Sequence, residues 1–344
     1  MVTKRASMIL TLTINPAVDR IVSVDKLVFE DRAYILDQKE VAGGRGVNAS
    51  IVLHRFAGKT LALVTSGGAA GERMEKSLAG MGFPFEVVRV RPESRTNLTI
   101  SDKQGLTVKL NELGYTLSAG ELNQIRHLVE ARLAKARWLM ICGSIQPGVP
   151  SSFYCEIIEM AKARGVKTLL DTDGEALVHG VEAKPTVITP NQHEAERLLG
   201  RALLTRIQFL EAVDRLQAMG PESIILSLGS RGAIGSGPEG VFEALPPRVD
   251  ALCPIGAGDS LAAAFVWAMD KKKPFYEALR WGVASGTASA ALPGMSFPTI
   301  EQTRAIYKQV EVRPARWTIG LRLAGVPASW SLMPAGRHSL TARS

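Results

Sequence analysis

The sequence is poor in cysteine. Its 344 residues include only three cysteines, and Cys142, Cys155 and Cys253 follow no spacing typical of metal ligands. This scarcity excludes a disulfide framework and a cysteine-based metal site. Because an odd number of cysteines in a long chain is typical of reduced thiols, we expect a cytoplasmic protein.

Long blocks of a single charge are also absent. The formal net charge is +8, but half of it comes from the segment between Pro314 and Ser344, which has four arginines and no acidic residue. The one tight basic run, Lys271-Lys272-Lys273, has no interleaved aromatic residues and is typical of a solvated face. We therefore expect no nucleic-acid partner, whereas small anionic substrates suit a mildly basic body.

No segment has the pattern of a signal peptide or a membrane span. The apolar run at residues 8–14 follows Lys4 and Arg5, but it ends at Asn15-Pro16 without a small-residue cleavage site and predicts a strand. Residues 281–300 carry no charge, yet their glycine, serine, threonine and proline make them too polar for a bilayer. We expect no membrane partner.

Two common nucleotide-binding motifs are missing as well. The sequence contains neither Gly-x4-Gly-Lys-Ser/Thr nor a Gly-x-Gly-x-x-Gly that opens a strand–helix unit. A P-loop for phosphates and a dinucleotide-binding fold therefore lack their fingerprints.

What the sequence does contain is a regular alternation of apolar runs with segments that have apolar residues at helical spacing. Such alternation predicts an α/β fold, in which helices cover both faces of a mostly parallel sheet to give three α/β/α layers. The expected strands are residues 8–14, 61–65, 138–142, 166–171, 186–189 and 223–228. The expected helices are residues 47–56, 71–81, 119–134, 151–164, 191–199 and 205–219.

Ligands of such sheets bind beyond the carboxyl ends of the strands. This rule places five short segments on one rim, namely Asn15-Pro16, Gly143-Ser144, Asp171-Thr172, Pro190-Asn191 and Gly229.

Two segments break the alternation. Residues 20–38 and 95–110 have alternating, more polar strands with no helix between them, which predicts a small separate β-sheet that lies over the rim as a lid. The sequence after Arg313 shows little periodicity, so we expect a poorly ordered tail over residues 314–344. We expect one domain over residues 1–313, with lid strands within about 20–40 and 95–112.

The stretch most informative about function is Pro254-Ile255-Gly256-Ala257-Gly258-Asp259-Ser260, which precedes a predicted buried helix at residues 261–269. Amides at a glycine-opened helix start point outward, and the helix dipole adds positive charge there. Asp259 has two interpretations. It is either a helix cap, or a general base beside amides of Gly256, Ala257 and Gly258 that hold a migrating phosphate.

Three further features have a structural and a functional interpretation. The cluster Gly43-Gly44-Arg45-Gly46-Val47-Asn48 is either a loop before a helix or a place where a substrate approaches the backbone and Asn48 meets its hydroxyls. Asp19 either caps a turn or clamps two sugar hydroxyls. Arg95 and Lys109 either lie on a solvated strand face or hold an anionic substrate as the lid closes.

Two other segments are candidates for contact with a nucleotide. Asn191-Gln192-His193-Glu194 opens a predicted helix, where Glu194 either completes a capping pair or reaches bound Mg2+ through water. Residues 227–232, which include Ser227, Gly229 and Gly232, are either a strand with its turn or a loop that passes close to a nucleotide.

In order along the chain, these pieces resemble the PfkB-type sugar kinases, which have the ribokinase-like fold. The similar blocks are residues 11–19, 43–48, 171–177, 191–194, 227–232 and 256–260. The resemblance implies an ATP- and Mg2+-dependent phosphotransferase with Asp259 as its base. It further implies that Asp19, Gly43, Gly44 and Asn48 hold sugar hydroxyls, that Asn191, Ser227, Gly229, Gly232 and Gly258 bind ATP, and that Glu194 binds Mg2+ through water.

Within that family, the chain resembles most the branch that phosphorylates sugar phosphates. Arg95-Thr96-Asn97 is similar to that branch's lid block, and residues 109–114 are similar to a block of the fructose 1-phosphate kinases. The resemblance implies that Arg45, Arg95 and Lys109 hold the acceptor's phosphate, that Ser144 contacts substrate, and that lid strands pair two subunits. Kinases of fructose 6-phosphate, tagatose 6-phosphate or neutral sugars and nucleosides remain alternatives, as does a non-catalytic sensor of sugar phosphates or nucleotides.

Three positions depart from the pattern of that branch. Arg45 stands where lysine is usual, and the two side chains differ in geometry. Asp173 replaces the usual serine beside the nucleotide phosphates and adds negative charge. Cys253-Pro254 replaces a hydroxyl-bearing pair, and proline has neither a hydroxyl nor an N–H. The second and third departures motivate the sensor alternative.

Overall fold

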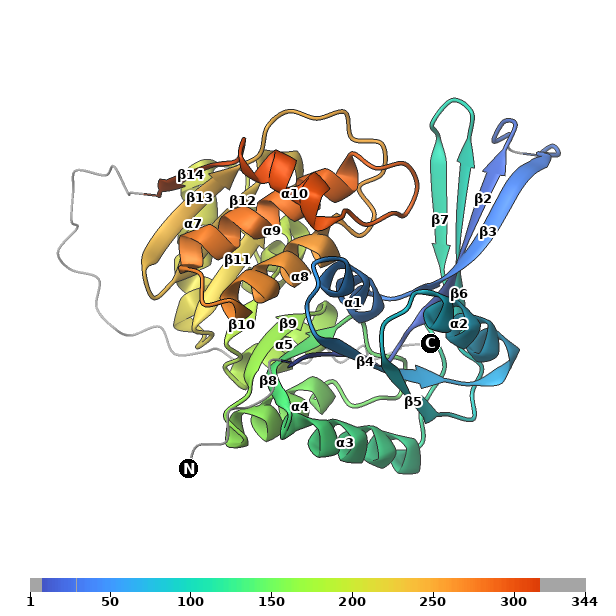
Figure 1. Cartoon of the computed structure of the whole chain (residues 1–344), viewed down its shortest axis with the longest axis horizontal. Helices are drawn as coiled ribbons and strands as arrows, with labels where there is room; N and C mark the ends of the chain where they lie inside the picture. The colour runs from blue at the N-terminus through green and yellow to red at the C-terminus, as the bar shows by residue number, and fades with distance from the viewer. Residues whose placement is uncertain (1–7, 29, 316–344) are drawn as a thin grey trace, which may run out of the picture.

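The computed structural model describes residues 8–28 and 30–315. Most of these residues belong to a large sheet or to the helices that cover it (Figure 1). Its ten strands have the order β14-β13-β12-β11-β10-β9-β8-β1-β4-β5. Neighbours from β5 to β11 are parallel, and β12, β13 and β14 continue the sheet antiparallel. The strands are β1 (Met8–Thr13), β4 (Thr60–Ser66), β5 (Phe85–Arg89), β8 (Ala136–Cys142), β9 (Lys167–Asp171), β10 (Val187–Ile188), β11 (Ser223–Ser227), β12 (Ala233–Gly237), β13 (Gly240–Leu245) and β14 (Glu311–Pro314).

Helices cover both faces of this sheet, as predicted. On one face, α1 (Arg45–Arg55), α8 (Ala257–Asp270), α9 (Phe275–Ala290) and α10 (Ile300–Tyr307) bury a shared apolar cluster. On the other face lie α3 (Ala119–Leu133), α4 (Phe153–Ala163), α5 (Gly174–Glu182), α6 (Gln192–Leu199) and α7 (Arg206–Ala218). Burial on both faces explains why the central strands are apolar along their whole length.

All six strands and six helices predicted from the alternation are present, with ends shifted by a few residues. Strand β12 escaped prediction because its sequence, Ala-Ile-Gly-Ser-Gly, looks like a turn. Its glycines have a packing reason. A Cβ at Gly237 would lie 2.7 Å from the ring of Phe275, and one at Gly235 would lie 2.9 Å from Leu279.

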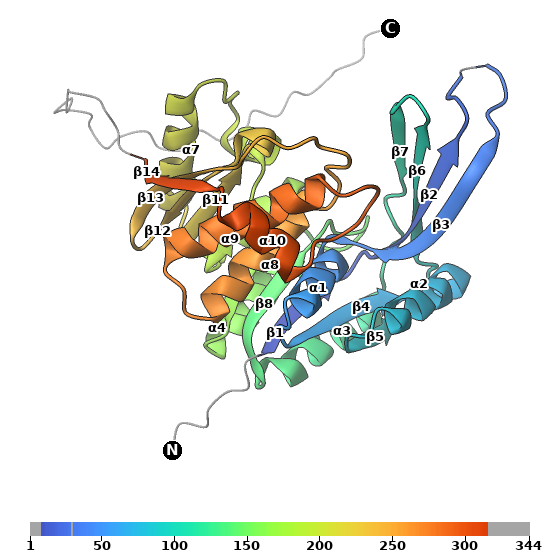
Figure 2. The same ribbon diagram turned by 45° about the horizontal axis from the view of Figure 1, so that its top comes forward.

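A second, four-stranded sheet stands apart from the first and is the predicted lid (Figure 2). Its strands are β2 (Ala17–Val24), β3 (Ile35–Gly43), β6 (Arg95–Asp102) and β7 (Thr107–Asn111), in the order β3-β2-β6-β7. Helix α2 (Gly68–Gly80) packs beneath it. Because β1 leads directly into β2, and β3 directly into α1, the lid strands begin and end beside the carboxyl end of β1.

The predicted boundary of the tail is wrong by two residues. Pro314 pairs with Phe242 in the sheet, and the amide of Ala315 donates a hydrogen bond of 2.8 Å to the carbonyl of Val241. Residues 316–344, the rest of the predicted tail, lie outside the described residues. In the described part of the chain, no helix has the length and apolar character needed to cross a membrane.

Candidate active site

A cavity of about 490 Å3 lies where the lid meets the carboxyl ends of the central strands. Lid strands β2, β6 and β7 line one side, and the ends of β9 and β11 with the starts of α1, α6 and α8 line the other. The lining residues are Asp19, Gly44, Arg45, Asn48, Arg95, Asn97, Thr99, Lys109, Asn111, Asp171, Thr189, Asn191, Glu194, Ser227, Ile255, Gly256, Gly258, Asp259, Leu261 and Met295.

Asp259 lies in the first turn of α8 and is 9% exposed. The helix begins after Gly256, whose φ of 79° is left-handed and favours glycine. Among the described residues, the side chain of Asp259 accepts no hydrogen bond from an amide of α8. Its Oδ2 instead accepts a hydrogen bond of 2.7 Å from Nδ2 of Asn48. The interpretation of Asp259 as a helix cap is therefore wrong.

The surroundings of Asp259 raise the pKa of its carboxyl group. Burial raises its pKa and the charge of Asp171 raises it further, whereas the Asn48 hydrogen bond and Arg45 lower it, with the result that the pKa is about 7. Removal of a carboxylate from water penalises the charged form. A carboxylate with a pKa near neutral pH is suited to take a proton from a hydroxyl.

The amides at the start of α8 are only partly available to an anion. The Ala257 amide donates a hydrogen bond of 3.2 Å to the carbonyl of Pro254, and Ala257 does not line the cavity, so the structure does not support its predicted role. Gly256 and Gly258 do line the cavity. A Cβ added at Gly258 would meet no heavy atom of the described residues within 4 Å, which leaves the backbone open to a ligand.

The glycines before α1 form a packed loop, and one of them lines the cavity. A Cβ at Gly43 would lie 1.9 Å from Oδ2 of Asp19, so a side chain there would displace that carboxylate. Gly43 itself does not line the cavity, in contrast to Gly44, the N-cap residue of α1 with a φ of 118°. The cluster is thus a packed loop that positions Asp19 and also reaches the cavity.

On the lid side, Asp19 of β2 pairs with Asn97 of β6. Oδ1 of Asp19 accepts a hydrogen bond of 2.8 Å from Nδ2 of Asn97, its register partner. Burial raises the pKa of Asp19, although the Asn97 hydrogen bond and the charges of Arg95 and Lys109 oppose the shift. Asp19 is therefore a fixed carboxylate that faces two cations.

The two lid cations differ in their freedom. Arg95 donates hydrogen bonds of 3.1 and 2.9 Å to the backbone carbonyls of Asn15 and Glu112, and burial lowers its pKa. The ammonium group of Lys109 makes no hydrogen bond or ion pair with the part of the chain that the structure describes. Lys109 is thus the cation with more donors available to an entering anion.

Arg45, at the start of α1, bridges three carboxylates. Its Nη1 lies 2.9 Å from Oδ1 of Asp171, and its Nη2 lies 2.6 Å from Oδ2 of Asp173 and 3.4 Å from Oε1 of Glu194. Burial lowers its pKa, but the surrounding carboxylates outweigh burial and leave the pKa above its ordinary value. Arg45 therefore reaches the cavity as a guanidinium that is already paired.

The start of α6 forms the predicted capping pair inside the cavity. The side chain of Asn191 accepts a hydrogen bond from the Glu194 amide, and Oε2 of Glu194 accepts one from the Asn191 amide, both 2.9 Å long. Burial raises the pKa of Glu194, and the charge of Asp171 adds to the effect. Capping and a place in the site therefore coexist, since both residues line the cavity with Ser227 of β11.

Three more predicted residues do not reach the cavity lining. Ser144 lies beside Asn15, which donates it a hydrogen bond of 3.2 Å. Gly229 and Gly232 belong to the turn after β11, with φ values of 62° and 88°. A Cβ at Gly232 would lie 2.0 Å from the carbonyl oxygen of Ala244, so backbone packing alone requires that glycine.

Other lining residues were not predicted as site residues. Asn97 and Thr99 of β6, and Asn111 of β7, follow Arg95 and Lys109 at a spacing of two, so they lie on the same face of the lid. The period of a strand could have found them. Thr189 follows β10 at the rim, and its buried hydroxyl has no partner among the described residues.

The donor set fits Mg2+ only as an ion that arrives with phosphates. In residues 8–28 and 30–315, no group of three or more His, Cys, Asp or Glu side chains could hold a metal. Both carboxylate oxygens of Glu194 already accept hydrogen bonds, one from Asn191 and one from Arg45. Mg2+ keeps several waters and takes few protein ligands at nucleotide sites, so contact with Glu194 through water fits this geometry.

Comparisons with known proteins agree with this arrangement. The family model for pfkB family carbohydrate kinases matches residues 11–302. The 1-phosphofructokinase of Bacillus subtilis is 32% identical over 289 residues, which cover 82% of this chain and 92% of that protein. The tagatose-6-phosphate kinase of Staphylococcus epidermidis is 28% identical over 308 residues, which cover 89% and 99%. The structure of Escherichia coli phosphofructokinase-2 with fructose-6-phosphate has a TM-score of 0.82 and 27% identity, over 88% of this chain and 98% of that chain.

Proposed function

The chain belongs to the pfkB family of carbohydrate kinases, and from this premise we propose that it transfers the γ-phosphate of ATP to a phosphorylated ketohexose. Fructose 1-phosphate is the proposed acceptor and fructose 1,6-bisphosphate the product. The observation that carries the proposal is the carboxylate of Asp259, which is buried in the cavity with a pKa of about 7. It lies at a helix start whose glycine backbone is open to a ligand.

In this reaction Asp259 is the general base. The acceptor hydroxyl gives its proton to the Asp259 carboxylate as its oxygen attacks the γ-phosphorus, and the bond from that phosphorus to the bridging oxygen of ADP breaks. Asn48, which donates to Oδ2, orients the carboxylate and leaves its other oxygen for the proton. The transfer then needs no other base from the chain.

The backbone at the start of α8 supports the charge of the group in transfer. Gly256 and Gly258 line the cavity at a helix start, where the helix dipole favours negative charge, and we assign their amides to the migrating phosphate. Release of the Ala257 amide from the Pro254 carbonyl would add a third donor. In the geometry described, two glycine amides carry this role.

The lid selects the acceptor. Asp19 and Asn48 hold sugar hydroxyls, while Lys109 and Arg95 hold the phosphate that the acceptor already has. Residues 109–114 resemble a block of the fructose 1-phosphate kinases, and the Bacillus subtilis relative is named 1-phosphofructokinase. The tagatose-6-phosphate kinase and phosphofructokinase-2 relatives keep tagatose 6-phosphate and fructose 6-phosphate as alternatives.

On the opposite side of the cavity, Asn191, Ser227 and Gly258 contact the phosphates of ATP, and the turn with Gly229 and Gly232 lies behind them. Mg2+, when bound, neutralises charge on the nucleotide phosphates, and Glu194 holds its water shell. Arg45 adds positive charge that acts on Asp259.

A coupled ADP-release assay tests the proposal. ATP and Mg2+ are held constant while fructose 1-phosphate, fructose 6-phosphate, tagatose 6-phosphate and unphosphorylated sugars are compared. We expect the largest kcat/KM with fructose 1-phosphate. Preference for another phosphosugar would correct the proposed acceptor and leave the proposed reaction in place. Calorimetric binding of phosphosugar without ADP release from any acceptor favours the sensor alternative.

We also propose that two copies pair through the lid in the cytoplasm. The lid exposes large apolar side chains, including Ile35 (57%), Leu36 (52%) and Leu110 (55%), on strands with free edges. Sedimentation velocity should give a dimer that Leu36→Lys weakens. A monomer at assay concentration for the parental chain contradicts this assembly.

A further inference from the structure

Asp173 is the N-cap residue of α5, yet it does not cap its helix. Its backbone has the extended conformation usual for an N-cap, but its side chain makes no capping hydrogen bond. Oδ2 instead accepts a hydrogen bond of 2.6 Å from Nη2 of Arg45. An aspartate at this position usually stabilises its helix through a cap. The contact with Arg45 therefore replaces a capping hydrogen bond that would stabilise α5.

The three carboxylates around Arg45 differ in how much they depend on it. The side chains of Asp171 and Glu194 are 10% and 8% exposed, whereas that of Asp173 is 36% exposed. A buried carboxylate that loses its cation is left uncompensated at high cost. Asp173 can turn to solvent or to the amides of α5, so its bond is the one that can be exchanged.

The charge around the cavity makes this exchange a competition. Carboxylates of Asp19, Asp171, Glu194 and Asp259 line it, against the cations Arg45, Arg95 and Lys109, and Asp173 adds a further negative charge at the edge. The charge of Asp173 acts on Arg95 as well as on Arg45. A phosphate that enters this site must therefore compete with Asp173 for a guanidinium.

We propose that Asp173 is a specificity-determining residue that competes with a phosphate oxygen of the substrate for Nη2 of Arg45. In the free enzyme, Asp173 and, at a longer distance, Glu194 contact Nη2, and Asp171 holds Nη1. When substrate binds, the phosphate oxygen takes Nη2, Asp171 keeps Nη1, and Asp173 swings to cap α5. The competition raises the KM of the ligand whose phosphate reaches Arg45 and disfavours ligands that present a neutral group there. This inference rests on the proposed kinase function.

Two phosphates could reach Arg45, namely the γ-phosphate of ATP and the phosphate of the acceptor. Separate KM values for ATP and for fructose 1-phosphate distinguish them, because only the ligand that displaces Asp173 gains from its removal. Asp173→Asn keeps the shape and capping ability of the residue and removes its charge. We expect the KM of one ligand to fall about tenfold, the scale of one charge-assisted hydrogen bond, with kcat within about twofold.

Two controls separate this role from a general charge effect. Glu175→Gln removes one negative charge from the exposed first turn of α5, two residues from Asp173, and should leave both KM values within about twofold. In an Arg45→Lys background, where the planar fork is gone, Asp173→Asn should change KM less than about twofold. An unchanged or higher KM for both ligands in Asp173→Asn overturns the proposal, as does an equal fall in Glu175→Gln.

The proposed function and this inference can fail separately. ADP release by the parental enzyme, with KM values that do not respond to Asp173→Asn, leaves the kinase function in place and removes the inference. If no acceptor supports ADP release, the proposed function fails. The exchange is then judged by the shift in melting temperature that inorganic phosphate causes in parental and Asp173→Asn protein. A larger shift in the variant supports it, and equal shifts overturn it.

Discussion

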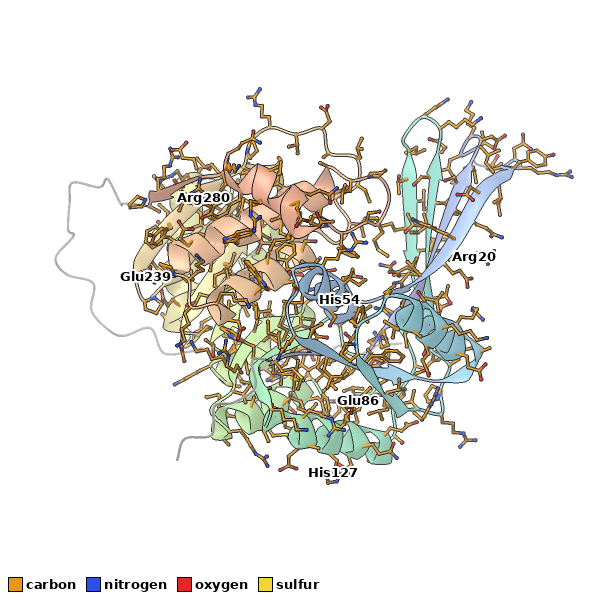
Figure 3. The ribbon with its side chains drawn as sticks, in the orientation of Figure 1. Arg20, His54, Glu86, His127, Glu239 and Arg280 are labelled. Atoms are coloured by element: carbon orange, nitrogen blue, oxygen red, sulfur yellow. The ribbon has the colours of Figure 1, made fainter. Side chains whose placement is uncertain are left out.

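The body and the lid line one cavity but are built differently. In the body, strand β9 and helix α8 bury most of their residues, and Leu170 and Phe265 are 0% exposed. In the lid, β3 and β7 are exposed along most of their length. Arg20, labelled in Figure 3, lies on the lid and donates an exposed hydrogen bond of 2.7 Å to Gln38.

This difference in burial suits the body and the lid to different tasks. A pKa shift as large as that of Asp259 needs deep burial and fixed neighbours, which the start of α8 in the body provides. Lys109 of the lid offers an entering anion a cation without a hydrogen bond or ion pair to the described residues, and an exposed sheet with few buried contacts can move around a ligand. We infer that the body determines the chemistry and the lid selects the acceptor.

The largest expected effect is at Asp259. Asp259→Asn removes the base, so kcat should fall by about 10²–10⁴-fold with ATP and fructose 1-phosphate. The same change removes a buried charge beside Asp171, and asparagine can still accept from Asn48, so the melting temperature at pH 8 should rise. Near-parental turnover in the folded variant would place the base elsewhere.

Asp270, at the other end of α8, is the matched control. It is 7% exposed, lies outside the cavity lining, and accepts a hydrogen bond of 2.7 Å from Nε of Arg137. Asp270→Asn should cost about 1–3 kcal/mol of stability and leave kcat unchanged. The Asp259 variant should thus lose activity and gain stability, whereas the Asp270 variant should keep its activity and lose stability.

The next effect tests the lid. Lys109→Ala should lower kcat/KM for phosphorylated acceptors about 10–100-fold, the value of one or two charged hydrogen bonds, without loss of stability. Activity with unphosphorylated sugars should not change. Lys103→Ala, in the turn between β6 and β7 outside the cavity lining, is the control. Equal losses with both classes of acceptor would mean that the lid acts on the chemistry itself.

A smaller effect returns to the body. Gly258→Ala adds a Cβ that meets nothing in the described structure, so the helix should gain about 0.5–1 kcal/mol. The methyl group occupies the space proposed for the migrating phosphate, so kcat should fall about tenfold. Gly120→Ala in α3, on an open surface, should give stability without loss of activity. Full activity in Gly258→Ala would move the phosphate away from this backbone.

The sequence predicted the body well because its signals are local. Apolar runs and helical spacing gave the central strands and helices, and glycines beside an acid located Asp259. Helix α9 escaped prediction because its small residues resemble a loop. A Cβ at Gly286 would lie 2.9 Å from the carbonyl oxygen of Ala257, so close contact with the start of α8 explains the glycine.

What could not be predicted depends on contacts between distant residues. Asp171, Asp173 and Glu194 are 126, 128 and 149 positions from Arg45, and no local pattern indicates that they neutralise it. The loss of the Ala257 amide to Pro254 depends likewise on the path of a turn. The lid pair Asp19 and Asn97 lay within reach of prediction, since both residues lie on regular strands.

The last expected effect, as small as that of Gly258→Ala, is the response to pH. With a pKa of about 7, Asp259 is mostly protonated at pH 6 and mostly ionised at pH 8, so kcat/KM should rise about tenfold between them and level off above. The sign for stability is opposite. The folded pKa lies above the ordinary value of 3.8, so the contribution of Asp259 to stability is full below about pH 4 and is lost as pH rises through about 7.

Asn48→Ala removes a hydrogen bond that lowers the pKa of Asp259 and should move the midpoint of the rate profile upward. Lys109 is not among the main causes of the Asp259 pKa shift, so Lys109→Ala should leave the midpoint nearly in place. A shift in that variant would show that the lid takes part in determining the chemistry, and the division between body and lid would fail.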